Sequence, residues 1–392
     1  MPTYPTYKLG DVADYINGRA FKPKEWKEKG LPIVRIQNLN DENAEYHYSD
    51  VMHEDKYLLH NGDLLFAWAA SLGTYIWNNG DAWLNQHIFK VIPKENVSKK
   101  YLYFALTSII KELYAKSHGS GMVHVTKDKF VNTEIPLPPL PTQQAIVARI
   151  ESLFAELDKA EAHLRTAQQQ LKIYKQTVLN HWLNNEDEEW EKKTAEECVV
   201  DENYSLAIGP FGSDLKVEDY TESGVKLVFV RDITSKFKDK KNKFVSEYKA
   251  DQLKAHNVFK GDLLITKMGD PPGQTGIFPF DRGVITSDVL RMKTNDKILN
   301  KYYAMYYILS SEGGKQIKEM TQGVAQKKIS LGRFKKFLFP VPEISEQQRI
   351  VEEIESRLSQ AEAAEARIAE SLQKTEALRQ SILKKAFCGE LV

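Results

Sequence analysis

The stretch Asp270-Pro271-Pro272-Gly273 comes closest to a catalytic motif in this sequence. Adenine-N6 methyltransferases hold the amino group of a flipped base with Asp-Pro-Pro followed by an aromatic residue, whose ring stacks on the base. Here Gly273 occupies the aromatic position, and the sequence has no glycine-rich strand-to-helix turn for a methyl donor. The pattern therefore favours a plain turn in a loop over a methyltransferase site.

A nucleotide-binding loop and a metal site are the other catalytic possibilities. The sequence has no G-x-x-x-x-G-K-[ST] stretch, so an ATP-driven motor is unsupported. The nine histidines are scattered, and the pair His118 and His124 has no third ligand at metal-binding spacing. We therefore predict no catalytic residue and no metal site in this chain.

A larger set of polar residues has side chains suited to nucleic acid. Paired donors and acceptors bind base edges, whereas Lys, Arg and small polar groups bind phosphates. These residues gather in loops at corresponding places of two repeated units. The candidates for nucleic-acid contact are Arg35, Gln37, Asn38, Ser71, Tyr75, Gln86, His87, Ser120, Lys127, Lys129, Arg231, Asp232, Lys267, Gln274, Thr275, Gln322, Gln326, Lys327 and Lys328.

Some basic residues have an equally good structural interpretation. Arg35 and Arg231 follow strand residues, so a role as ion-pair partners is as well supported as a role in binding. Five lysines form a basic run: Lys236, Lys238, Lys240, Lys241 and Lys243. Such a run is more commonly a solvated loop, but beside a DNA groove each lysine that displaces a counterion steepens the salt dependence of binding.

The elements that must position these loops occur twice. Residues 143–183 contain no Gly or Pro and follow a proline-rich segment, and a second such stretch follows Pro340 and Pro342 and runs to Gly389. Gln143 aligns with Gln347, 204 residues later, and the register holds without a gap to the end of both stretches. Register kept over about ten helical turns indicates an internal repeat.

The spacing of apolar residues in both stretches predicts long helices that need a partner. In the first copy they alternate four and three residues apart, which is the pattern of a coiled coil. A helix of this length spans roughly 60 Å at about 1.5 Å per residue, and a lone apolar stripe of that length is unstable in water. The second copy is the nearest candidate partner. The predicted core of the helix pair is Ile146, Ile150, Leu153, Leu157, Leu164, Leu171, Val178, Ile350, Ile354, Leu358, Ile368, Leu372 and Ile382, with Ala160, Ala167, Tyr174, Ala361 and Leu378 on the same stripes.

A globular unit precedes each helix. In residues 1–135 we predict short strands at 31–36, 63–66 and 87–92, a turn at Asn61-Gly62 and a helix at 99–114. The second unit repeats these landmarks loosely. Gly261-Asp262-Leu263-Leu264 matches Gly62-Asp63-Leu64-Leu65 at an offset of 199, and Val230-Arg231 is matched to Val34-Arg35 at an offset of 196. The scaffold is kept while the loops differ.

Composition limits the class of protein. The 392 residues are enough for two or three domains, and 54 basic against 54 acidic residues argue against a binder that relies on overall charge. Two cysteines without CxxC spacing favour a reducing cytosol. The most apolar run, residues 101–110, is half of a membrane span, and the N-terminus lacks the apolar segment of a signal peptide, so we expect neither membrane insertion nor export.

Two similar scaffolds with dissimilar loops suit a target that is symmetric in backbone and asymmetric in sequence. Duplex DNA has these properties, because dyad-related phosphates recur whatever the bases, and two modules can read half-sites at a fixed spacing. A structural adaptor that joins two protein-binding domains through a coiled coil is the alternative, and the neutral overall charge is its best support.

The tandem arrangement resembles a known family over nearly the whole chain. Two Pro-x-Pro and Gln-Gln-x-Ile-Val helix segments, each after a unit with Gly-Asp-Leu-Leu, are similar to the conserved regions and target-recognition domains of type I restriction-modification specificity subunits. The resemblance implies an α+β fold: two mixed α/β target-recognition domains, a pair of long antiparallel coiled-coil helices and an internal tandem repeat with pseudo-twofold symmetry. The expected segments are residues 1–135 (first recognition domain), 136–185 (proline linker and first helix), 186–339 (second recognition domain) and 340–392 (proline linker and second helix).

The same resemblance implies a DNA-recognition subunit of a prokaryotic, cytoplasmic complex with no catalysis of its own. Each recognition domain would read one part of a bipartite double-stranded DNA site with an unspecified gap. Two methyltransferase subunits and two restriction subunits would be the protein partners. S-adenosylmethionine, ATP and Mg would belong to those partners, and this chain would bind no cofactor.

Overall fold

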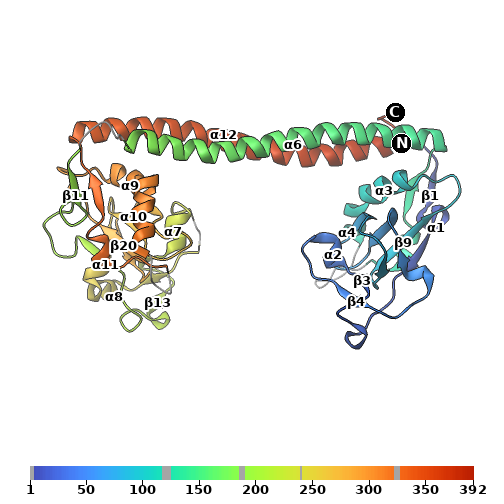
Figure 1. The fold of residues 1–392 in the computed structure, drawn as a ribbon, viewed down its shortest axis with the longest axis horizontal. Helices are drawn as coiled ribbons and strands as arrows, with labels where there is room; N and C mark the ends of the chain where they lie inside the picture. Colours follow the sequence, from blue (N-terminus) through green and yellow to red (C-terminus); the bar gives the residue numbers. More distant parts are fainter. Residues whose placement is uncertain (1–3, 117–124, 185–189, 239–240, 322–326) are drawn as a thin grey trace. The chain divides into compact units, whose positions relative to one another are not determined.

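The computed structural model describes residues 4–116, 125–184, 190–238, 241–321 and 327–392 (Figure 1). The chain divides into two compact units, the first of Met1–Arg165 with Ala369–Val392 and the second of Thr166–Ile368. Each unit contains one globular head and parts of both long helices, α6 (Leu140–Leu183) and α12 (Ile344–Phe387). The first head is residues 4–139 and the second head is residues 190–343. Both predicted long helices are confirmed, and each begins three residues before its Gln-Gln pair.

The first head is built from short strands and helices. The strands predicted at 63–66 and 87–92 are confirmed. The strand predicted at 31–36 ends at Val34, because Ile36 begins a short helix, and the helix predicted at 99–114 is broken into two helices at Ile109. The elements are β1 (Thr6–Lys8), α1 (Leu9–Val12), β2 (Ala13–Asn17), η1 (Pro23–Glu25), β3 (Leu31–Val34), α2 (Ile36–Asn40), β4 (His47–Ser49), η2 (Asp55–Tyr57), β5 (Leu58–Leu59), β6 (Asp63–Ala67), β7 (Gly73–Trp77), β8 (Ala82–Leu84), β9 (Ile88–Pro93), α3 (Lys99–Ser108), α4 (Ile110–Lys116), α5 (Lys127–Val131) and β10 (Glu134–Pro136).

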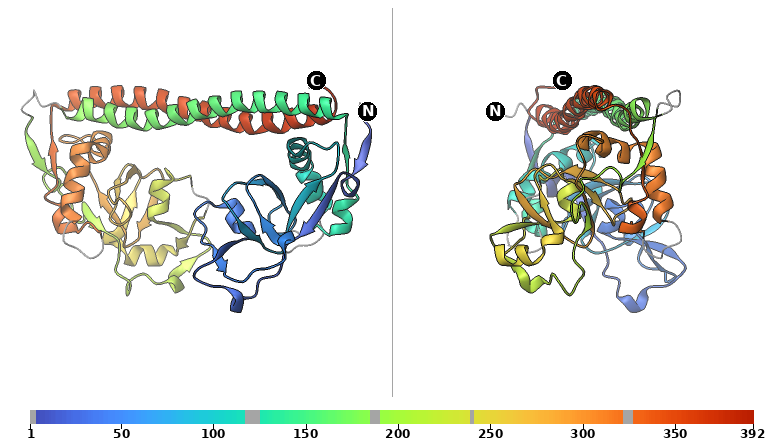
Figure 2. Two further views of the ribbon diagram at one scale, coloured as in Figure 1. Left: turned by 45° about the vertical axis from the view of Figure 1, so that its right-hand side comes forward. Right: turned by 90° about the vertical axis from the view of Figure 1, so that its left-hand side faces the viewer.

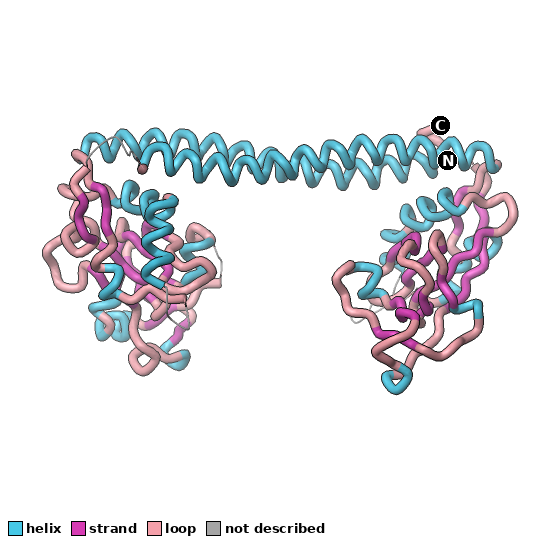
Figure 3. The backbone as a smooth tube through the Cα atoms, viewed as in Figure 1, coloured by secondary structure: helices cyan, strands magenta, loops and turns pink. Residues whose placement is uncertain are grey.

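The second head repeats this order of elements, with two additions and with a turn at residues 195–198 where the first head has α1; Figure 3 colours the helices and strands of both heads. Its elements are β11 (Lys192–Thr194), β12 (Leu206–Ile208), η3 (Val217–Asp219), β13 (Tyr220–Thr221), β14 (Val225–Val228), α7 (Val230–Thr234), β15 (Phe244–Val245), α8 (Glu247–Gln252), η4 (Lys254–His256), β16 (Asn257–Phe259), β17 (Leu263–Thr266), β18 (Thr275–Ile277), β19 (Arg282–Ile285), β20 (Val289–Met292), α9 (Lys301–Leu309), α10 (Ser311–Thr321), α11 (Leu331–Phe334) and β21 (Leu338–Pro340).

The sheets of the two heads have matching topology. In the first head one sheet has the order β2-β9-β6-β7 and the other β4-β3-β8-β5; in the second head the orders are β12-β20-β17-β18 and β13-β15-β14-β19-β16. The central pairs β3–β8 and β14–β19 are parallel, and their neighbours are antiparallel. The β1–β10 and β11–β21 ribbons also correspond. The internal repeat predicted from the sequence therefore extends to strand order, and the α+β class is confirmed.

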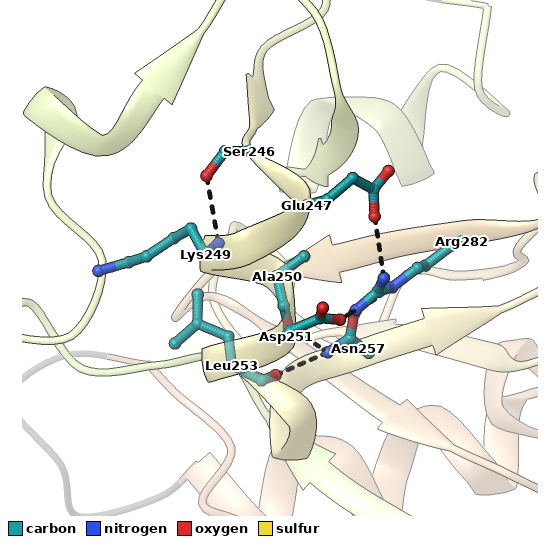
Figure 4. A network of polar contacts seen from close by, with 8 residues as sticks. All are labelled: Ser246, Glu247, Lys249, Ala250, Asp251, Leu253, Asn257 and Arg282. Atoms are coloured by element: carbon teal, nitrogen blue, oxygen red, sulfur yellow. Dashed lines mark hydrogen bonds and ion pairs between the residues drawn. The ribbon is translucent and has the colours of Figure 1, made fainter.

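The additional helix α8 is fixed to the second head by a polar network (Figure 4). Arg282 on β19 forms ion pairs with Glu247 at 3.0 Å and with Asp251 at 2.6 Å. The buried Asn257 accepts a hydrogen bond from Arg282 and donates to the carbonyl oxygens of Ala250 and Leu253, at 2.8 and 2.9 Å. The face of α8 that carries Ala250 is thus held against the second head, and Tyr248 of the same helix is exposed.

Within each unit the two long helices lie side by side and run antiparallel (Figure 2). In the first unit the N-terminal part of α6 meets the C-terminal part of α12, where Asp158 pairs with Arg379 and Arg379 lies 5.2 Å from the ring centre of Phe154. In the second unit Lys175 of α6 pairs with Glu365 of α12 at 2.6 Å. The antiparallel pairing implied by the resemblance is confirmed in both units.

The core of each head continues into the helices. In the first unit Ile146 and Ile150 of α6 and Phe387 of α12 are buried in the cluster that holds α3 and β9. In the second unit Val178 of α6 and Ile354 of α12 occupy the corresponding cluster with α9 and β20. Because apolar burial contributes about 25 cal/mol per Å², these contacts bind each head to both helices rather than to one.

The helix seam agrees with the predicted core at most positions. Ile146, Ile150, Val178, Ile350 and Ile354 are buried. The remaining predicted core residues are half-buried: Leu153, Leu157, Leu164, Leu171, Leu358, Ile368, Leu372 and Ile382.

The prediction that three further residues lie on the apolar stripes is wrong. Leu378 is 50% exposed, and Ala160 and Tyr174 are also exposed. The second helix instead buries Thr375, which is 6% exposed and whose hydroxyl donates to the carbonyl oxygen of Ser371 at 3.0 Å. A polar residue that satisfies its own hydroxyl can keep the four-three spacing, so apolar character alone misplaced the stripe by three residues here.

One buried glutamine joins each long helix to its head. The side chain of Gln143 accepts from the Ser98 backbone N–H at 2.8 Å and donates to the carbonyl oxygens of Asn96 and Pro138 at 3.0 and 2.8 Å. Gln347 makes the equivalent three bonds, to the Asn300 N–H and to the carbonyl oxygens of Ile298 and Pro342. Ser98 and Asn300 are the N-caps of α3 and α9, so each glutamine connects the start of a long helix with the start of the helix beneath it.

None of the helices within the described ranges has the length and apolar content that crossing a lipid bilayer requires.

Replacement of Gln143 by alanine should destabilise the first unit. The substitution leaves three backbone groups without this partner, the carbonyl oxygen of buried Pro138 among them, at roughly 1–3 kcal/mol for each group that is cut off from water and stays unsatisfied. We expect the apparent melting temperature of the full chain to fall by about 4 °C or more in thermal unfolding followed by circular dichroism. Gln168→Ala, at an exposed position of the same helix, is the matched control. Equal melting temperatures for the two variants would contradict the role of this glutamine.

Candidate nucleic-acid interface

Three segments of the first head meet at a glycine that has no room for a side chain. The N–H of Gly18 donates to the carbonyl oxygen of Ile88 at 3.0 Å, and Arg19 exchanges backbone hydrogen bonds with Leu84 and Gln86. A Cβ atom on Gly18 would lie 2.0 Å from the carbonyl oxygen of Asn85. Glycine is therefore required where the end of β2 crosses the β8–β9 connection.

The second head has the same crossing. The N–H of Gly209 donates to the carbonyl oxygen of Val289 at 3.1 Å, and a Cβ atom there would lie 2.0 Å from the carbonyl oxygen of Thr286. Gly209 therefore corresponds to Gly18.

Two further segments complete each crossing. Trp68, after β6, donates its N–H to the His87 carbonyl oxygen, and Lys267, after β17, donates to the Asp288 carbonyl oxygen. The carbonyl oxygens of Trp68 and Lys267 accept from Val125 and Ile329, respectively. We call these regions the first junction (residues 18–20, 68, 85–87 and 125) and the second junction (residues 209–211, 267, 286–288 and 329). They combine equal backbones with different side chains.

The short helices α2 and α7 present a second matched pair of positions. The Arg35 N–H donates to Asn38 Oδ1 at 3.1 Å, and the Phe229 N–H donates to Asp232 Oδ2 at 2.9 Å. Phe229 is thus the counterpart of Arg35, at an offset of 194, and the alignment of Val34-Arg35 with Val230-Arg231 was two residues off. Arg231 is the counterpart of Gln37.

Two of the predicted contact residues have buried structural roles. Asn38 is 6% exposed and also donates to the carbonyl oxygens of Ala44 and Glu45. Asp232 is 2% exposed and forms an ion pair with Lys226 at 3.1 Å. Capping of the helix N-terminus accounts for both residue types.

The other candidates differ in exposure. Gln37, Gln86, Lys127, Lys129, Lys327 and Lys328 are exposed. Half-buried positions are Arg35, Ser71, Tyr75, His87, Arg231, Lys267, Gln274 and Thr275. Ser120, Gln322 and Gln326 lie outside the described residues.

Aromatic neighbours orient several of the basic side chains. The Arg35 guanidinium lies 5.6 Å from the ring centre of Trp26, and that of Arg231 lies 4.2 Å from the ring centre of Phe229. The sequence left open a role for Arg35 as an ion-pair partner. In the part of the chain that the structure describes Arg35 forms no ion pair, and its structural contact is with the ring of Trp26. Arg231 also donates to the carbonyl oxygen of Lys241 at 2.9 Å.

The basic run divides between structure and solvent. Lys236 pairs with Glu362 of α12, and this hydrogen bond lowers the pKa of the glutamate. Lys238 and Lys243 are exposed, and Lys240 lies outside the described residues. One lysine of the run thus serves the contact of the second head with its helix.

The loop with the Asp-Pro-Pro motif lacks the geometry of a base-flipping site. Gly273 has a φ of +89°, and a Cβ atom there would lie 2.9 Å from Ile317 Cγ2, so an aromatic ring has no space at this position. Asp270 is exposed and pairs with Lys327 at 3.4 Å. Within the described ranges no cluster of three or more His, Cys, Asp or Glu side chains could hold a metal ion.

Sequence reasoning missed several junction residues. Arg19, Phe211 and Ser287 were not among the candidates, although the junction brings them beside residues that were. Each junction glycine has an apolar residue two positions before it, Ile16 before Gly18 and Ala207 before Gly209. This shared spacing is a signal that could have identified the crossing.

Substitution at Gly209 should disrupt the second junction. The Cβ atom of Gly209→Ala would meet backbone rather than a flexible side chain, and overpacking of this kind costs about 1–3 kcal/mol. Gly212→Ala is the matched control, because no atom lies within 4 Å of its Cβ position. We expect a lower urea midpoint for Gly209→Ala only, and indistinguishable midpoints would contradict the close crossing.

The sequence of this chain matches one protein family over most of its length. The family model described as "Type I restriction modification DNA specificity domain" matches residues 1–165 and 215–374. The EcoBI specificity subunit of Escherichia coli is 28% identical over 98% of this chain and 85% of its own length, and the EcoKI specificity subunit of strain K12 is 22% identical over 98% and 88%.

Solved structures agree with the fold. A chain from a type I R-M system, studied for complex assembly and conformational transition, has a TM-score of 0.76 at 20% identity and covers 100% of this chain and 99% of its own. The HsdS subunit from Thermoanaerobacter tengcongensis has a TM-score of 0.58 at 20% identity, with 100% and 98% covered. Because the family model covers most of its residues, the chain belongs to the type I restriction-modification DNA specificity subunits, the non-catalytic subunits of these systems.

Proposed function

We propose that each head of this specificity subunit reads one half of a bipartite double-stranded DNA site and that the helix pair sets the length of the unspecified gap. The observation that carries the proposal is the pair of junctions, where two backbones of equal design display different side chains. Trp68 and His87 in the first junction stand where the second has Lys267 and Asp288. Different donors and acceptors on one scaffold suit different base sequences beside equivalent phosphates.

The proposed contact residues are the accessible candidates on or near the junctions and short helices. Gln37 and Gln86 have amide groups suited to base edges, while Lys129 and Lys328 are suited to phosphates. Asn38 and Asp232 are omitted because their polar atoms are committed inside the heads.

Partners and cofactors follow from the family. The chain would join two methyltransferase and two restriction subunits in the cytoplasm of a prokaryote, where its DNA substrate lies. S-adenosylmethionine, ATP and Mg would be bound by those partners. Neutral overall charge was the main support for the adaptor hypothesis. It does not argue against DNA binding by a local recognition surface, because contacts with one groove do not need a basic protein overall.

Exchange of the first head tests the division of labour. Replacement of residues 1–135 by the corresponding domain of another specificity subunit should change one half of the methylated sequence and leave the other half and the gap unchanged. Methylome sequencing of cells that express the hybrid with its methyltransferase measures this. An unchanged motif, or a change in both halves, would count against separate reading by the two heads.

Lengthening both helices tests the gap. Insertion of one heptad near Gln168 in α6, with a matching heptad near Leu372 in α12, keeps the apolar seam in register. Because each residue adds about 1.5 Å of helix, the heptads add roughly 10 Å, equivalent to about three base pairs of B-DNA. A longer gap between unchanged half-sites is expected in the selected duplexes, and an identical gap would refute the proposed role of the helices.

A further inference from the structure

The second junction carries a large aromatic side chain that the first lacks. Phe211 follows Gly209 and Pro210, and 64% of its surface is exposed. The equivalence of Gly18 and Gly209 places Ala20 at the corresponding position of the first head. Because so much of the ring is in solvent, packing within the head does not explain an aromatic residue here.

A lysine lies beside this ring. Lys267 Nζ is 5.8 Å from the ring centre of Phe211 and donates to the carbonyl oxygen of Ser287 at 3.2 Å. At the matching place of the first junction, Trp68 Nε1 donates to Asn17 Oδ1 at 3.1 Å and the indole stacks on Phe89. The aromatic group is therefore on the strand end in the first head and on the loop in the second.

The surroundings of Phe211 have both signs of charge. An isolated bridge between Met268 and Lys328 brings a second lysine next to Lys267. Burial lowers the pKa of Lys267, the positive charge of Lys328 lowers it further, and Asp288 opposes both. Lys327 is paired with Asp270, but Lys328 forms no ion pair within the described ranges. An anion beside Lys267 and Lys328 would relieve their mutual repulsion.

These groups match the parts of a nucleotide. Aromatic rings stack on bases or pack against the thymine methyl group, ammonium groups bind phosphates, and an aspartate accepts from the amino group of cytosine. The mixture of Phe211, Asp288 and two lysines provides all three kinds of contact on one small surface.

We propose that Phe211 is a specificity-determining residue of the second head: its ring contacts the bases of the second half-site while Lys267 and Lys328 hold the flanking phosphates. The inference rests on the proposed DNA function. The first head has no counterpart at Ala20, so the contribution of this loop is confined to one half of the site.

A matched control comes from the same head. Tyr248 on α8 is 74% exposed, more than Phe211, but its helix carries Glu247 and Asp251, an acidic pair held by Arg282 (Figure 4). Phosphates are repelled by such a surface. Substitution of Tyr248 therefore removes an exposed aromatic ring without removing a DNA contact, and so isolates the effect of the contact at Phe211.

The experiment uses the full chain in complex with its methyltransferase subunits. Duplexes selected from a random library by the wild-type complex define the two half-sites. For Phe211→Ala we expect the affinity for the selected duplex to fall roughly tenfold or more, and the base preference to be relaxed within the second half-site only. Tyr248→Ala should bind within about twofold of wild type, Phe211→Trp should retain most of the affinity, and all three variants should keep the wild-type melting temperature.

Lys328→Gln tests the phosphate contact. Removal of one phosphate contact should reduce the slope of log K against log salt by about one, with base preference unchanged. An unchanged slope would overturn the assignment of Lys328.

Each remaining outcome points to one conclusion. If Phe211→Ala binds as Tyr248→Ala does, or loses affinity equally for all sequences, the proposal for Phe211 is wrong while the proposed function stands. If the wild-type complex selects no duplex, the proposed function itself fails.

Discussion

A helix of 44 residues with one apolar stripe is stable in water only when another surface covers that stripe. In this protein two such helices, α6 and α12, cover each other, and each also supplies apolar residues to both units. Ile146, near the start of α6, and Phe387, at the end of α12, are buried in one core. The heads therefore cannot be detached from the helices without exposing part of their own cores, which makes the helix pair the structural basis of the whole molecule.

The buried glutamines and the crossing glycines show how the repeat separates structure from recognition. Gln143 and Gln347 make the same three hydrogen bonds, and Gly18 and Gly209 meet the same kind of backbone contact. Substitution at these positions is constrained because their partners are backbone atoms. The hydrogen bonds that Trp68 and Lys267 share between the two junctions use only their backbone atoms, so their side chains can differ on equal scaffolds. Variation of this kind is what a family of DNA specificity subunits requires.

Much of the fold could be predicted because its signals are long or duplicated. The four-three spacing identified both helices, and Gly-Asp-Leu-Leu marked β6 and β17 in both heads. Short-range detail was less predictable. The counterparts Arg35 and Phe229 share a backbone role but no chemistry, so matching by residue type shifted the alignment by two positions. Leu378 was placed on the seam for a similar reason, since apolar character does not show that Thr375 satisfies its hydroxyl and takes the buried position.

The candidate site was harder to predict than the fold. Asn38 and Asp232 have the polarity expected of contact residues, but their geometry as helix caps depends on backbone hydrogen bonds that the sequence does not display. Phe211 was missed for the opposite reason, because an aromatic residue in a sequence suggests a core, and only its exposure beside Lys267 indicates a surface role.

Mapping of methylated adenines in cells that express this chain with its partner subunits, against cells that lack only this chain, tests the central claim most directly. The account predicts one bipartite motif that depends on the chain, with two short specified parts at a constant spacing. A contiguous motif, or a methylation pattern that is the same without the chain, would contradict it.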